Sequence, residues 1–218
     1  MKSWQRLFSV LVAIGTMAQN IYAMEFDFQP LSSLCRIEVN LATGFGSGTI
    51  RGTFGKMKGT LFFSPENPQQ TEGRILLASR SLRFGYPKVA YDTHAPDWLD
   101  STNYPEILFQ LNELQNFSWY GKELRAEAIG QLSIKGVQKS VTIPMSIHYF
   151  RDERRKYEGK RGDLLRLDGI LRISRSEFGL SPQNYFDVIL ENIDVLVSIT
   201  GASNRVRPLL PSRLFQSL

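Results

Sequence analysis

Hydrophobic and polar residues alternate along most of the chain from residue 35 onward. A period of two places every second side chain on the same face of a β-strand. We therefore predict about eight or nine strands, each with one apolar face. The alternation covers residues 35–41, 50–54, 61–63, 75–77, 107–111, 124–134, 141–149, 165–173 and 195–199.

Short turn-forming sequences join these segments, such as residues 65–68, 120–122 and 135–137. Many strands with short turns and few helical signals predict an all-β antiparallel sandwich or barrel. The apolar face that includes Ala128 and Gly130 mixes very small residues with large ones, as a curved wall around a narrow lumen requires. We predict a single antiparallel barrel of about eight strands.

One segment, residues 95–104, departs from the alternation. Pro96 and Asp97 suit the first turn of a short helix, and Pro105 would end that helix. We expect this short helix to cover one end of the barrel.

The two ends of the chain differ from the middle. Lys2 and Arg6 precede an apolar run of about 12 residues, shorter than the roughly 20 needed to span a bilayer. This is the pattern of a secretory signal peptide, so we expect a periplasmic or secreted protein without a transmembrane segment in its mature chain. The expected parts are a signal peptide at 1–23, a barrel domain at 24–200 and a C-terminal extension at 201–218.

Charge and cysteine content exclude other classes of protein. The chain has 26 basic and 21 acidic residues, and two of the basic ones belong to the expected signal peptide. The basic run at 151–166 contains acids and only one aromatic residue, Tyr157, so it predicts a solvated hairpin loop and no nucleic-acid site. With Cys35 as the sole cysteine, no internal disulfide can form.

Residue types that perform catalysis are sparse. The alternation places His148 on the face opposite Ile147, toward solvent, whereas His94 follows Asp92 by two residues beside the expected helix. An oriented imidazole at His94 therefore stays open as an alternative. The sequence has no nucleophile elbow, no phosphate-binding loop and no spacing typical of metal ligands. We predict no catalytic residue and no metal site.

The order of several motifs resembles the YceI-like family. The motifs are IRGTFGKMKGTLFFSP at 50–65, DWLDSTNYPEILFQ at 97–110, GQLSIKGVQKSVTIP at 130–144, ISRSEFGL at 173–180 and IDVLVSI at 193–199. The resemblance implies a lipocalin-like barrel that encloses a long isoprenoid chain, of polyprenyl or quinone type, in an exported protein. The protein would then be a carrier, store or scavenger of an isoprenoid lipid.

The match is incomplete at two places. Arg175, Phe178 and Gly179 match the family's R-x-D-F-G, but Glu177 replaces the aspartate. Residues 32–33 are two serines, where the family often has His-Ser. We expect Phe178 to turn toward the core, with Gly179 permitting the bend.

The candidate ligand-binding residues are the inward-facing side chains of the expected strands, together with Arg175. For Arg175, pairing with Glu177 or bonding to the loop backbone is favoured over contact with a ligand head group. A one-residue bulge would turn part of the inward set outward. The inward set consists of Ile50, Phe54, Leu61, Phe63, Leu77, Phe109, Leu132, Ile134, Ile143, Met145, Leu171 and Ile173.

Two further interpretations remain open. One is an isomerase or hydrolase that acts on an apolar substrate at the barrel mouth, with His94, Asp92 and Arg175 as its polar groups. The other is a stress-related interaction module with a filled barrel, whose C-terminal extension binds a partner. A homodimer, formed through a barrel edge or the Leu-rich extension, is also compatible with the sequence.

Overall fold

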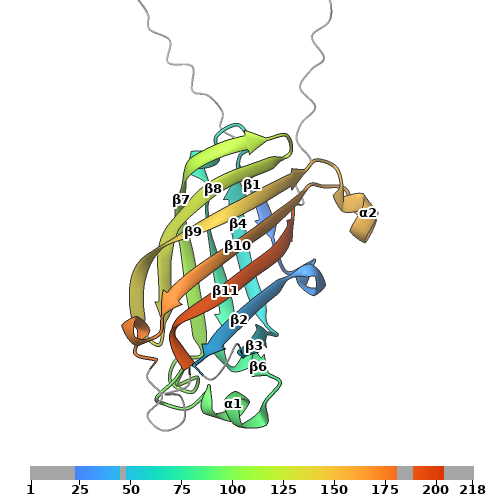
Figure 1. The fold of residues 1–218 in the computed structure, drawn as a ribbon. Coiled ribbons are helices and arrows are strands. Elements are labelled where there is room, and N and C mark those ends of the chain that lie inside the picture. Colours follow the sequence, from blue (N-terminus) through green and yellow to red (C-terminus); the bar gives the residue numbers. More distant parts are fainter. Residues whose placement is uncertain (1–22, 45–47, 181–188, 204–218) are drawn as a thin grey trace, which may run out of the picture.

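The computed structural model describes residues 23–44, 48–180 and 189–203. Within them the chain forms one antiparallel sheet that closes into a barrel (Figure 1). This confirms the predicted fold class. The strands are β1 (Met24–Asp27), β2 (Arg36–Thr43), β3 (Thr49–Phe54), β4 (Met57–Phe63), β5 (Glu72–Ala78), β6 (Leu82–Phe84), β7 (Glu106–Tyr120), β8 (Glu123–Ile134), β9 (Val137–Phe150), β10 (Leu164–Ser174) and β11 (Ile189–Ala202).

Eleven strands fill eight positions around the barrel because three positions are each divided between two short strands. The strand order is β1-β4-β5-β7-β8-β9-β10-β11-β2-β3-β6, and β1 also pairs with β11. Thus β1 and β2 lie along the same neighbour, β11, and the chain between them forms the 3₁₀ turn η1 (Ser32–Leu34). A second turn, η3 (Ser79–Ser81), separates β5 from β6. A third, η2 (Pro68–Gln70), precedes β5.

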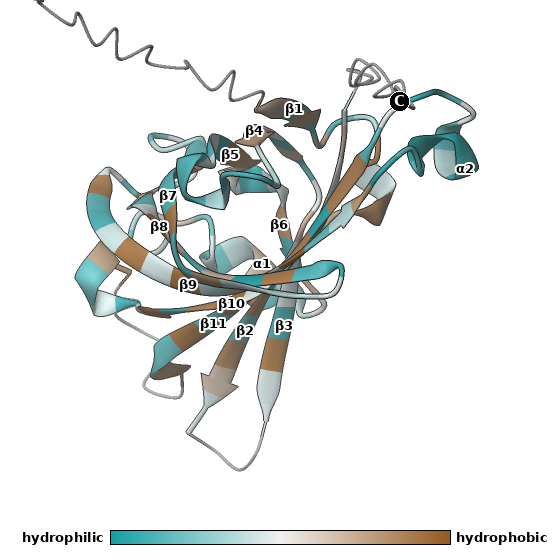
Figure 2. Cartoon of the chain, turned by 90° about the horizontal axis from the view of Figure 1, so that it is seen from above, coloured by the Kyte–Doolittle hydropathy of each residue, from teal (hydrophilic) through white to brown (hydrophobic). Residues whose placement is uncertain are grey.

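The alternation correctly predicts which side chains face the interior. In β8 every second residue from Leu124 to Ile134 is buried, and those between them are exposed or half-buried. Figure 2, seen from above, shows the same alternation of hydrophobic and hydrophilic residues along the strands. Strand β7 is the exception, because its register with β8 shifts between Leu111 and Glu113 and again between Gln115 and Ser118.

Small residues make room for aromatic rings on neighbouring strands. A Cβ atom at Gly52 would lie 2.5 Å from the ring of Phe84. A Cβ atom at Gly130 would lie 2.7 Å from the ring of Phe109 and 2.4 Å from the carbonyl oxygen of Gln110. The mixture of small and large residues thus reflects specific contacts between adjacent strands.

The predicted helix at 95–104 is wrong. The helix in this region is α1 (Pro87–Asp92), and the residues after it form successive turns. Asp100 has a φ of 44°, which a helix does not allow. Trp98 and Leu99 are nevertheless buried in the core, so α1 and these turns cover one end of the barrel (Figure 1).

The basic hairpin between β9 and β10 is mostly exposed, as predicted, but it is not a plain loop. It contains a short helix, α2 (Arg154–Glu158), and the Arg154 side chain is only 2% exposed. The Arg154 guanidinium donates to Glu158 and to the backbone oxygen of Ser203, the latter at 3.2 Å. Asp163 accepts from the Tyr149 hydroxyl at 2.6 Å. The hairpin is therefore fastened to the end of β11.

None of the helices within the described ranges is long and apolar enough to cross a membrane. The expected signal peptide lies outside the described residues except for Ala23, and so does the expected extension from residue 204 onward. Strand β11 itself ends at Ala202.

Candidate functional site

Two apolar cavities of about 90 Å³ each lie inside the barrel. Both are lined almost entirely by hydrophobic side chains, and Arg74 is the only charged residue among the described residues that line them. The cavities lie next to each other within the lumen, because they share Leu77, Ile107, Leu132, Leu171 and Val195.

The apolar lining of the cavities suits a hydrocarbon ligand and offers almost no hydrogen-bonding group to a polar one. An apolar cavity of about 150 Å³ stays dry and can hold benzene, whereas sites for drug-sized ligands span roughly 300–1,000 Å³. The lumen therefore has room for a short piece of an apolar chain. A longer chain requires side chains such as Met145 to move, and an unbranched thioether does this readily.

Most of the candidate binding residues line these cavities. The first cavity is lined by Leu61, Leu77, Phe109, Leu132, Ile143, Met145 and Leu171, and the second adds Phe54, Ile134 and Ile173.

Three of the candidates lie elsewhere. Phe63 is fully buried, with its ring centroid 6.2 Å from that of Tyr149. Ile50 is half-buried against the core, and Arg175 lies after β10 at the turn η4 (Ser176–Phe178).

Sequence reasoning missed several residues that line the second cavity: Leu82, Phe84, Trp98, Leu99 and Leu180. Strand β6 has only three residues, too few to show a convincing period. Trp98, Leu99 and Leu180 lie outside the strands and helices, where no period indicates which side chains face inward.

Arg175 does not pair with Glu177, contrary to one of the expectations. Its guanidinium donates to the backbone oxygen of Leu180 at 3.2 Å and lies 3.6 Å from the carboxylate of Glu191. Glu177 instead lies 3.8 Å from the Lys139 ammonium. The expected bond to the loop backbone is therefore present, and the acid partner comes from β11.

Glu191 on β11 accepts several hydrogen bonds from the turn that follows β10. The hydroxyl groups of Ser174 and Ser176 and the backbone N–H of Ser176 all donate to its carboxylate. These hydrogen bonds favour the ionised form and lower the pKa of Glu191 to about 2. Phe178 is buried and Gly179 has a φ of 65°, which confirms the inward turn of Phe178 and the role of the glycine.

His94, Asp92 and Arg175, the polar groups of the alternative interpretation as an enzyme, do not lie together in one site. His94 Nε2 lies 3.1 Å from the backbone oxygen of Leu82, which can only accept, so this nitrogen carries the proton. Asp92 pairs with Lys88 at 3.3 Å. Within the described residues, no hydrogen bond or ion pair joins His94, Asp92 and Arg175.

His94 instead belongs to a buried chain of hydroxyl groups that sequence reasoning missed. Its Nδ1 accepts from Ser101 at 2.9 Å, and Ser101 lies 2.6 Å from the Ser79 hydroxyl. Burial lowers the pKa of His94, which favours the neutral ring. Ser79 and Ser101 are each 1% exposed, so a substrate cannot reach them. The chain of hydrogen bonds ties the turns after α1 to the wall of the barrel.

Cys35 lies where β1 gives way to β2. Its thiol donates to the backbone oxygen of Leu31 at 3.4 Å, and burial raises the pKa of the Cys35 thiol. Such a thiol is a weak nucleophile. Among the residues the structure describes, no group of three or more His, Cys, Asp or Glu side chains is placed to hold a metal ion.

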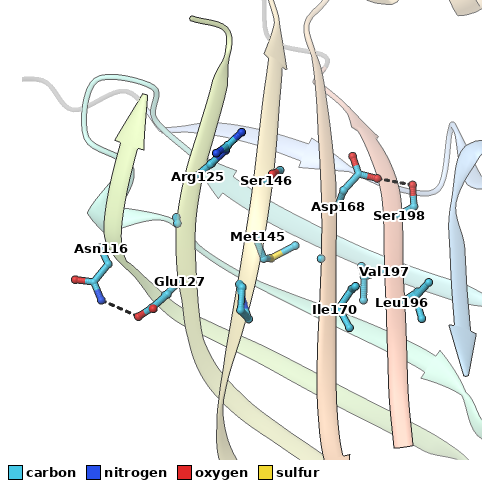
Figure 3. Close-up of a pocket in the computed structure, with 13 residues that line it drawn as sticks. Asn116, Arg125, Glu127, Met145, Ser146, Asp168, Ile170, Leu196, Val197 and Ser198 are labelled. Atoms are coloured by element: carbon cyan, nitrogen blue, oxygen red, sulfur yellow. Dashed lines mark hydrogen bonds between the residues drawn. The ribbon is translucent and has the colours of Figure 1, made fainter. Parts of the chain in front are cut away.

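A wide, shallow groove of about 790 Å³ crosses the outer wall over β7 to β11 (Figure 3). Sequence reasoning missed it. Polar side chains such as Arg125, Glu127 and Asp168 line it together with the apolar Ile170 and Leu196. Met145 and Val197 line both this groove and the first cavity of the lumen.

Comparison with solved structures supports the fold. BcnA of Burkholderia cenocepacia is 18% identical with a TM-score of 0.62, covering 77% of this chain and 96% of its own. The YceI protein of Campylobacter jejuni is 14% identical with a TM-score of 0.58, covering 71% and 85%. A polyisoprenoid binding domain from Saccharophagus degradans, implicated in plant cell wall breakdown, is 9% identical with a TM-score of 0.59, covering 83% and 99%.

At these identities the three structures share the fold with this chain. No curated protein sequence matches it. The model of the YceI-like domain matches residues 26–201, from within β1 to one residue before the end of β11. The chain therefore belongs to the YceI-like domain family.

Proposed function

We propose that the protein is an exported lipid-binding protein that encloses a long isoprenoid chain, of polyprenyl or quinone type, in the barrel lumen. The observation that carries the proposal is the continuous apolar lining of two adjoining cavities within one barrel. The Saccharophagus degradans domain of the same fold, described as polyisoprenoid-binding, supports the class of ligand. The protein acts as a carrier, store or scavenger of this lipid.

Burial of hydrocarbon accounts for binding without any reactive group. Each buried methylene contributes about 0.8 kcal/mol, so enclosing even part of a polyprenyl chain gives substantial affinity. The contacts have no direction, and binding therefore tolerates variation in chain length. The signal-peptide pattern at residues 1–23 supports export to the periplasm or the exterior.

Organic extraction of the purified protein, followed by mass spectrometry, tests the proposal directly. We expect an isoprenoid lipid in the extract and saturable rebinding of a short-chain ubiquinone to the delipidated protein. An extract without lipid, together with no binding of ubiquinone or farnesol, would contradict the proposal.

Filling the lumen provides a matched test. Ala128 is fully buried on β8 and lines the first cavity, so Ala128→Leu fills space that the ligand needs. We expect ubiquinone affinity to fall by about tenfold or more, the equivalent of 1.4 kcal/mol. Gln131→Leu places the same side chain on the outward face of the same strand and should leave affinity unchanged. Equal affinities for the two variants, measured by fluorescence titration, would place the ligand outside the lumen.

A further inference from the structure

The backbone pairing between β9 and β10 ends partway along the barrel wall, and this unpaired stretch is called the opening. Their paired residues end at Gly169 and Met145. Beyond this point β10 continues to Ser174 paired with β11, and β9 extends back to Val137 paired with β8. The next β9 residue is Pro144, which has no N–H to donate to a neighbouring strand. The two strands therefore run on without bonding to each other.

The turn η4 bounds this opening at its far end. The Lys135 ammonium donates to the backbone oxygen of Gly179 at 2.9 Å, and Lys139 lies 3.8 Å from Glu177. Phe178 is buried beside these contacts. The opening thus has a limited length, with paired backbone at one end and side-chain contacts at the other.

Met145 lies at the opening. In Figure 3 its side chain extends from β9 toward β10. It is half-buried, and a Cβ atom at Gly169 would lie 3.2 Å from its Cγ atom. Glycine at this position leaves the space that Met145 occupies. Met145 and Val197 line both the groove and the lumen, so these two side chains lie between the two spaces, and the unbranched Met145 can change rotamer readily.

The rim of the groove is apolar near the opening and polar around it. Ile170 is 57% exposed and is paired with Leu196 on β11. Asp168 accepts from the Ser198 hydroxyl at 2.7 Å. An exposed isoleucine beside a carboxylate and a hydroxyl suits a ligand with one apolar and one polar end.

The charges of the rim disfavour an anionic ligand. Glu127 and Asp168 both contribute carboxylates. The Arg125 guanidinium is held by Glu123 at 3.0 Å, and Arg166 is held by Asp168 at 2.8 Å. The carboxylates would repel a phosphate, and the neighbouring arginines are already paired with acids. A hydroxyl group, in contrast, can donate a hydrogen bond to a carboxylate.

We propose that the groove is the head-group subsite of the lumen, in which an uncharged polar head rests while its isoprenoid chain passes between β9 and β10. The inference rests on the proposed function and adds the route of entry and the class of head group to it. Prenyl alcohols fit this subsite because their hydroxyl group can donate to its carboxylates. A quinone can only accept hydrogen bonds, but it is uncharged and is not repelled there, whereas a prenyl phosphate is repelled.

Stopped-flow quenching of tryptophan fluorescence by a short-chain ubiquinone tests the route, because Trp98 lines the second cavity. Ile170→Arg places a charged side chain at the opening. The control, Tyr91→Arg, makes the same change at the α1 end of the barrel, where Tyr91 is 80% exposed. We expect Ile170→Arg to slow association at least about fivefold and Tyr91→Arg to change it less than about twofold. Slowing by Tyr91→Arg alone, or equal rates for all three proteins, would overturn the route.

Competition between farnesol and farnesyl phosphate tests the head group. We expect wild-type protein to prefer farnesol by about tenfold, and Glu127→Gln with Asp168→Asn to reduce this preference to about threefold or less. Equal competition by both compounds in the wild type would overturn the subsite. If the wild type binds neither ubiquinone nor farnesol, the proposed function fails as well. If it binds them and Ile170→Arg changes nothing, only the route is wrong.

Discussion

At the scale of single residues, glycine positions decide how closely neighbouring strands and their rings approach. Gly52 lies under the ring of Phe84, and Gly130 lies under the ring of Phe109, which lines the lumen. These glycines occur in two of the motifs that resemble the family. Their physical role is to admit an aromatic ring from the next strand, so the resemblance at these positions reflects packing.

Gly130→Ala tests this role. A Cβ atom there would lie 2.4 Å from a backbone oxygen, so the strand must shift. We expect the free energy of unfolding to fall by about 1–3 kcal/mol. Gly85→Ala is the control, because no atom lies within 4 Å of a Cβ atom at that position, and it should change stability by less than about 0.5 kcal/mol. Urea denaturation of both variants measures the difference, and equal effects would refute the packing argument.

At the scale of elements, the turn η4 joins three strands. It follows β10, its Arg175 and serines contact Glu191 on β11, and Glu177 reaches Lys139 on β9. The segment ISRSEFGL has the residue types of a catalytic cluster. Its role is structural, because it links β9, β10 and β11 at the far end of the opening. Its charged residues are used for contacts within the protein.

The low pKa of Glu191 predicts how this turn responds to acid. Its pKa of about 2 lies below the ordinary value of 4.5, so its contribution to stability is present above pH 4.5 and is lost as the pH falls through 2. Glu191→Gln should therefore destabilise the protein at neutral pH, and its difference from the wild type should disappear near pH 2. Urea unfolding across this range measures the difference. Glu177→Gln serves as the exposed control, and a constant difference for Glu191→Gln would contradict the assignment.

At the scale of the whole molecule, few backbone contacts close the end of the barrel where β1 meets β11, although β2 pairs with β11 along the rest of that position. Among the described residues, a single register pair, Asp27 with Ala202, joins β1 to β11. Next to it the buried Arg154 contacts Ser203, and the backbone N–H of Ser203 donates to the oxygen of Asp163 at 3.0 Å. Side-chain anchors in the β9–β10 hairpin thus support the place where the first and last strands meet.

Removal of the Arg154 anchor should affect the whole fold. Arg154→Ala leaves the mostly buried carboxylate of Glu158 without this partner, and we expect a loss of about 3–5 kcal/mol. Arg155→Ala, an exposed neighbour in the same helix, should change stability by less than about 0.5 kcal/mol. Thermal unfolding compares the two, and similar melting temperatures would show that the hairpin does not support closure.

Period-two alternation was sufficient to predict nine of the eleven described strands and the barrel, because side-chain direction along a strand follows from local backbone geometry. It missed β1 and β6, which have only four and three residues, too few to show a period. The helix at 95–104 was placed wrongly, because the actual turns include a positive φ at Asp100 and are held by burial of Trp98 and Leu99. Proline and aspartate favour a helix start and a turn alike, so only the packing decided between them.

The sequence by itself determined the family resemblance, the antiparallel barrel and most of the apolar residues that line its lumen. Tertiary structure alone decided the partner of Arg175, the buried His94–Ser101–Ser79 chain and the opening beside Met145. These features depend on which residues of distant strands lie opposite each other and where their pairing ends. Alternation predicts on which face of its strand a side chain lies, but it does not predict the register between neighbouring strands.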